Sequence, residues 1–123
     1  MTKKINEDYT KHLNSHAKLL FDEYNIAFKN KMWATAIILS LTIIDNILSD
    51  TDTLDHIDGL DINYFKGSKD FHWLRIRRNN ILHFEKPLEG FFGNKDSKKI
   101  LELDAIRADT TLKKFFYTVF RKP

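Results

Sequence analysis

The stretch ATAIILSLTIIDNIL, from Ala34 to Leu48, is the most hydrophobic run of the chain and decides the fold. It is too short to cross a bilayer as a helix, and it contains Asp45 and Asn46. A helix over about 31–49 would be apolar around much of its circumference, which is typical of the middle helix of a bundle. Asp45 in such a helix needs a partner, because an unpaired charge among apolar groups is costly, and an arginine is the partner that we expect.

The segments on both sides of this run also predict long helices. From Ile5 to about Asn30 the apolar residues recur at nearly every fourth position, and a similar stripe runs through a final helix over about 97–121. The stripe of the first helix consists of Ile5, Tyr9, Leu13, His16 or Ala17, Leu20, Tyr24 and Phe28. The stripe of the final helix consists of Ile100, Leu103, Ile106, Leu112, Phe115, Phe116 and Val119.

Turn-forming residues divide the region between these helices. The acidic segment 50–70 contains two glycines, which predicts a long connection with room for one short extra helix. Ser68 or Asp70 can then cap a third helix that runs to about Phe84, and a proline and two glycines break the chain between 86 and 94. Because no segment of convincing length alternates as a strand would, the sequence predicts one all-α domain over 1–123, a bundle of four main helices.

Composition narrows the classes of function. The 123 residues include no cysteine, which excludes disulfides, thiolate metal sites and cysteine nucleophiles. The N-terminal MTKKINEDYT has no apolar core after its lysines, so we expect no signal peptide and a cytoplasmic protein that is not bound to a membrane. A net charge of +3 permits a polyanionic partner such as RNA without the charge load of a histone.

Motif searches exclude several chemistries and favour no cofactor. The sequence has no glycine-rich phosphate loop, no Walker lysine and no dinucleotide fingerprint. His12 and His16 share a helix face at a spacing that suits metal ligands, but no third ligand is marked, so an exposed polar strip is the favoured interpretation. His56 lies in the acidic connection, where we expect a solvated loop rather than a metal site. Five aromatic residues could suggest base stacking, but we expect them in the core: Trp33, Tyr64, Phe65, Phe71 and Trp73.

The segment RIRRNNILHFE, from Arg75 to Glu85, carries the chemistry that remains. On a helix Asn79 and His83 lie about 40° apart, whereas Arg78 lies about 140° from His83. A histidine titrates near neutral pH and can move protons, and an arginine presents forked donors to phosphate oxygens. Such a pair suits RNA cleavage, because the 2′-hydroxyl is an internal nucleophile and no metal is required.

Arg78-Asn79-Asn80-Ile81-Leu82-His83 resembles the R-x4–6-H motif of HEPN (higher eukaryotes and prokaryotes nucleotide-binding) domains, including the polar residue after the arginine. The small helical bundle and the acid on its second helix are similar as well. The resemblance implies a metal-independent endoribonuclease of toxin–antitoxin or anti-phage type, which leaves 2′,3′-cyclic phosphate and 5′-hydroxyl ends. It also implies a homodimer with a composite active site and a cognate antitoxin protein.

The same resemblance implies roles for individual residues. Arg78, Asn79 and His83 would be catalytic, and Asp45 and Arg77 would support them. Arg77 to His83 also fits the permitted spacing, so the arginine register stays open between Arg77 and Arg78. Otherwise Arg77 and Arg75 would contribute long-range attraction for RNA.

A noncatalytic helical module that binds a partner protein or RNA is the alternative. In that case His83 is a core or interface histidine, Asp45 is paired with an arginine, and the arginines form a solvated basic face.

Overall fold

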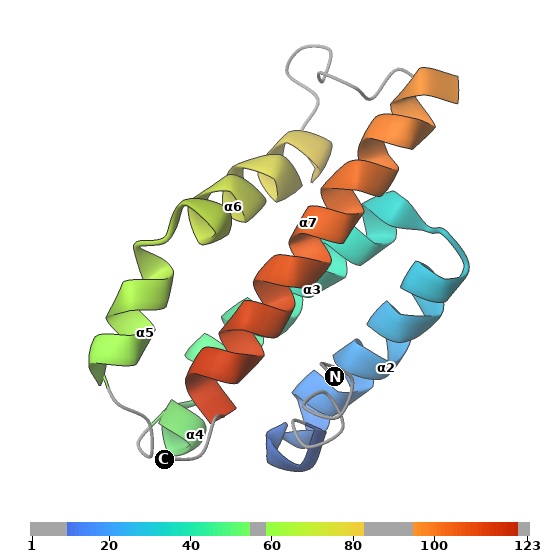
Figure 1. The fold of residues 1–123 in the computed structure, drawn as a ribbon. Coiled ribbons are helices and arrows are strands. Elements are labelled where there is room, and N and C mark those ends of the chain that lie inside the picture. The colour runs from blue at the N-terminus through green and yellow to red at the C-terminus, as the bar shows by residue number, and fades with distance from the viewer. Residues whose placement is uncertain (1–9, 55–58, 83–94, 121–123) are drawn as a thin grey trace.

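The computed structural model describes residues 10–54, 59–82 and 95–120. Within these ranges every regular element is helical and no strand occurs, which confirms the all-α prediction (Figure 1). The elements are η1 (Thr10–His12), α2 (Ser15–Lys29), α3 (Trp33–Leu48), α4 (Thr51–Leu54), α5 (Gly59–Lys66), α6 (Lys69–Leu82) and α7 (Lys95–Phe120).

The hydrophobic helix α3 is the centre of the bundle, as its composition predicts. It packs against α2, α6 and α7, and α7 runs across the front of it in Figure 1. Four of its residues are fully buried: Ile37, Leu41, Ile43 and Ile44. Other helices cover α3 on several sides, which agrees with its lack of a broad polar face. Within the described ranges, no helix is both long and apolar enough to span a membrane.

The first long helix begins later than its apolar spacing predicts. Residues 10–12 form a 3-10 turn, and α2 starts at Ser15 because the Asn14 side chain caps it, accepting a hydrogen bond of 2.7 Å from the amide of Ala17. The predicted start at Ile5 is therefore wrong at 10–14, and residues 1–9 lie outside the described ranges. The position of such a cap depends on one polar side chain, and the spacing of apolar residues does not indicate where that side chain lies.

The turn from α2 to α3 closes with Lys31 in the left-handed region, at φ 61°. The amide of Met32 donates to the carbonyl of Ala27 at 2.8 Å, and the amide of Lys31 donates to that of Phe28 at 3.1 Å. This is the Schellman pattern, in which glycine usually takes the position that Lys31 occupies. Lys31 therefore has a backbone conformation that is sterically unfavourable for a residue with a Cβ atom.

The connection from α3 to α6 contains two short helices, α4 and α5, where the sequence predicts one at most. Phe65 anchors α5, since it is buried and its ring lies 5.0 Å from the rings of both Phe71 and Phe115. The hydroxyl of Ser68 accepts a hydrogen bond of 3.2 Å from the amide of Phe71. Of the two predicted caps for the third helix, Ser68 is thus the one used.

The buried face of α7 is turned relative to the predicted stripe. Leu112, Phe115, Phe116 and Val119 are buried as predicted. The N-terminal half of the stripe is wrong, because Ile100, Leu103 and Ile106 are 39%, 57% and 47% exposed. The core contacts there come from Leu101, Ala105 and Ala108. The small alanine side chains allow α7 to pack closely against α3. The prediction misses them because it is based on large apolar side chains.

Four of the five aromatic residues behave as predicted. Phe65 and Phe71 are in the core, and Trp33 and Trp73 are partly buried against it. Tyr64 is the exception, since it is 82% exposed, so its assignment to the core is wrong.

Candidate active site on the α6 helix

Three arginines of α6 have three different environments, because each successive residue turns about 100° around the helix. Arg75 points toward α3, where its Nη2 lies 2.9 Å from Oδ1 of Asp45. The guanidinium also lies over the ring of Phe71, 5.1 Å from its centroid. The expected pairing of Asp45 with an arginine is confirmed, and Arg75 is that arginine.

Arg77 points the other way, toward α7. Its Nε donates to Oδ2 of Asp104 at 2.7 Å, and its side chain is only 9% exposed. Asp104 is itself 23% exposed, so this ion pair is largely removed from water. The expectation that Arg77 gives long-range attraction from a solvated face is therefore wrong: it ties α6 to α7.

Arg78 is half-buried. Its Nε donates to Oδ1 of the exposed neighbour Asn79 at 3.3 Å. Within the described part of the chain, no carboxylate forms an ion pair with Arg78. His83, the other half of the motif, lies outside the described residues, so the structure gives no distance between the two side chains.

The outer face of α6 combines these polar groups with exposed apolar ones. Ile76 and Leu82 are 46% and 52% exposed. Asn79 lies between them on the helix surface, three residues from each. This face of α6 thus presents polar and apolar side chains next to one another.

The two N-terminal histidines do not share a helix, so the predicted common face is wrong. His12 ends the 3-10 turn, and its ring stacks on Phe120 at 5.3 Å. His16 lies on α2, and its Nδ1 is 3.3 Å from Nδ2 of Asn46. No group of three side chains able to hold a metal ion occurs in 10–54, 59–82 or 95–120, and His56 falls outside them.

Comparisons with protein-family models, with curated proteins and with solved structures find no match.

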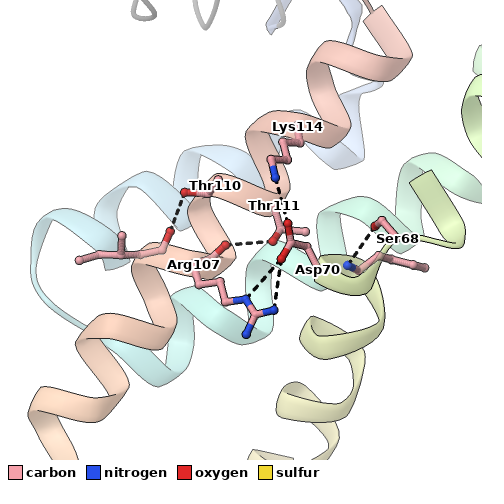
Figure 2. A network of polar contacts seen from close by, with 8 residues as sticks. Ser68, Asp70, Arg107, Thr110, Thr111 and Lys114 are labelled. Carbon is pink, nitrogen blue, oxygen red and sulfur yellow. Dashed lines mark hydrogen bonds and ion pairs between the residues drawn. The ribbon is translucent and has the colours of Figure 1, made fainter. Parts of the chain in front are cut away.

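No sequence pattern indicates a second feature, a groove of about 1090 Å³ between α5, the start of α6 and α7. Its wall contains Asp70, which accepts from Lys114 at 3.0 Å and from Arg107 at 3.2 Å (Figure 2). These cations, Lys114 first, hold the pKa of Asp70 below its ordinary value. The groove could not be predicted because two segments far apart in the sequence, 63–70 and 109–118, form it, and no motif connects them.

Proposed function

We propose that this protein is a metal-independent endoribonuclease of toxin–antitoxin or anti-phage type. It cuts RNA by attack of the 2′-hydroxyl on the adjacent phosphate and leaves 2′,3′-cyclic phosphate and 5′-hydroxyl ends. The motif from Arg78 to His83 carries the reaction. The resemblance of this motif to that of HEPN domains is the starting point of the proposal.

The environment of the arginines is the observation that best supports it. Arg75 and Arg77 are each paired with an aspartate of another helix, so their guanidinium groups already have partners. Arg78 is the arginine of this series that contacts only an uncharged amide among the described residues. No carboxylate among the described residues occupies its planar fork, which can hold two oxygens of a phosphate, and this favours Arg78 over Arg77 as the arginine of the motif.

The chemical roles follow from the side chains. His83 acts as general base or acid, because histidine is the side-chain type whose ordinary pKa lies nearest to neutral pH. Arg78 binds the scissile phosphate and stabilises the charge that grows on its oxygens in the transition state. Asn79 orients the imidazole or a phosphate oxygen. Asp45 supports the site indirectly, because its ion pair with Arg75 holds α6 against α3.

A homodimer completes the site in this proposal. In the helix that the sequence predicts to about Phe84, Arg78 and His83 would lie about 140° apart, so the two side chains of one chain would diverge. Ile76 and Leu82 offer exposed apolar area on each side of Asn79. A second copy packed on the same face would be related by a twofold axis, which brings both motifs together. An antitoxin protein would then act by covering this surface.

Product analysis tests the function. The purified protein, in the presence of EDTA, should cut single-stranded RNA and leave ends that a 2′,3′-cyclic phosphodiesterase can open. His83→Ala should lose this activity and Arg78→Ala should be slower by about a hundredfold, and both should keep the helical circular dichroism spectrum. Activity that remains unchanged in both variants would contradict the assignment.

A noncatalytic interaction module is the second candidate, and exposed apolar residues on α7 favour it. Leu103 and Ile106 are 57% and 47% exposed on the side of α7 that faces away from α3. A surface of this kind suits a protein partner and needs no catalytic residue. The two candidates are separated by toxicity on overexpression, which His83→Ala should relieve only if the protein is an enzyme.

A further inference from the structure

The groove between α5 and α7 has the chemistry of a nucleic-acid site. Its volume is about 1090 Å³, and Tyr64 and Tyr117 are on its walls. Tyr64 is 82% exposed and Tyr117 is 50% exposed, so both rings present area to solvent. Exposed aromatic rings of this kind form platforms on which bases stack, irrespective of sequence.

The charge of the groove suits a polyanion. Lys69, Lys113 and Lys114 lie on its walls, against the acids Asp70 and Asp109. Both acids are already neutralised: Asp70 by Lys114 and Arg107, and Asp109 by Lys113 at 3.1 Å. The lysine Lys69 has no ion pair within the described residues, so a phosphate would meet net positive charge.

Most of the exposed lining surface is apolar, but its residue types do not match a groove for an amphipathic helix. Such a groove needs aliphatic side chains that receive apolar anchors. Here Phe65 and Gly67 are the lining residues without a polar side-chain atom, and Phe65 is 5% exposed. The other lining side chains carry hydroxyl, amide or charged groups, among them Thr110 and Thr118. Hydroxyl groups can pair with the ribose 2′-hydroxyl, which distinguishes RNA from DNA.

We infer that this groove is a second RNA-binding site, which holds a single-stranded segment outside the nucleotides that are cut. Lys69 contacts a phosphate, and the two tyrosines stack on bases. The groove is separate from the motif, because Asp70 faces α7 whereas Arg78 lies about 12 Å further along α6 and about 80° around it. The inference rests on the proposed function for its choice of RNA.

Binding of a labelled oligouridine, measured by fluorescence anisotropy, tests this inference. All variants carry His83→Ala, so that the RNA stays intact. Tyr64→Ala should raise the Kd about tenfold, since one stacked base is lost. Tyr64→Phe keeps the ring and should bind like the parent. Leu19→Ala changes a residue that is 57% exposed on α2 and is the matched control, with no expected effect.

Lys69→Gln should lower the dependence of log Kd on log salt by roughly 0.7, as expected for one phosphate contact of a single strand. Lys18→Gln, an exposed lysine of α2, should leave the slope unchanged. Oligodeoxythymidine should bind more weakly than oligouridine.

Three results would overturn the inference: no binding of oligouridine, equal binding of the DNA oligomer, or an unchanged Kd in the Tyr64→Ala/Tyr117→Ala double variant. The proposed function fails separately. If Tyr64→Ala weakens binding but the protein with His83 intact cuts no RNA, the groove stands and the ribonuclease does not. If RNA is cut but the tyrosine variants bind normally, the ribonuclease stands and the groove does not.

Discussion

Removing the acid that partners Arg77 should destabilise the bundle far more than removing the acid that partners Arg75. In Asp104→Ala, the guanidinium of Arg77 loses its 2.7 Å contact at a site where the side chain is 9% exposed. An uncompensated charge in such a place costs about 3 kcal/mol, the lower end of the range for buried pairs because Asp104 retains some contact with water. For a chain of this length the melting temperature should fall by roughly 12 °C.

Asp45→Ala is the matched control. It also removes an aspartate from an arginine of α6, but the side chains of Arg75 and Asp45 are 42% and 36% exposed. Solvent screens this pair, so the loss should be about 0.5 kcal/mol. Chemical denaturation followed by circular dichroism measures both values. Equal losses, or a loss below about 1 kcal/mol for Asp104→Ala, would refute the assignment of Arg77 as a buried tie.

The double variant Arg77→Leu/Asp104→Leu extends this test to the register of the motif. Replacing both members of a buried pair by apolar residues is often neutral or stabilising, so the double variant should recover stability that Asp104→Ala loses. It should also cut RNA at a rate close to that of the wild type, because Arg78 remains. A stable but inactive double variant would move the motif to Arg77.

Four further results are expected. Tyr24→Phe should cost about 1 kcal/mol by denaturation, because burial raises the pKa of the Tyr24 hydroxyl and keeps it as a donor to Asp109 at 2.6 Å. Asp70→Asn should lower the free energy of unfolding at neutral pH by up to about 1 kcal/mol. The folded-state pKa of Asp70 is lowered, so the difference in stability between wild type and variant should be fully present above the ordinary pKa of 3.8. It should vanish as the pH falls through the folded-state pKa. Lys31→Gly should stabilise the protein by about 1 kcal/mol by relieving the left-handed backbone, whereas Lys31→Ala should not. Ile76→Asp should convert a dimer to a monomer by light scattering and reduce cleavage; a dimer that persists would exclude α6 from the interface.

The sequence predicts the central parts of the fold well, because they depend on many residues at once. Helix α3 (Trp33–Leu48) is apolar on nearly every side, and no single contact decides its place in the middle of the bundle. Helix ends depend on one or two groups. The start of α2 is set by the side chain of Asn14, and the apolar spacing before it predicts a helix that the described residues do not form.

The candidate site is predicted in part, for a similar reason. A partner for Asp45 follows from the cost of an unpaired charge, but the choice among three nearby arginines depends on how α6 is rotated against α3 and α7. That rotation places Arg77 inside the bundle and Arg78 at its edge. The groove beyond Asp70 depends on the mutual placement of α5, α6 and α7, which local sequence does not encode.

Cleavage of single-stranded RNA by the purified protein, with EDTA present, tests the central claim most directly. The wild type should produce 2′,3′-cyclic phosphate ends, His83→Ala should produce none, and Arg78→Ala should be slower by about a hundredfold, as expected when one charge-assisted contact to the transition state is lost. Arg78→Lys should be impaired as well, because a point charge replaces a bidentate fork. Absence of cleavage by the wild type, or equal rates in the wild type and Arg78→Ala, would contradict the account.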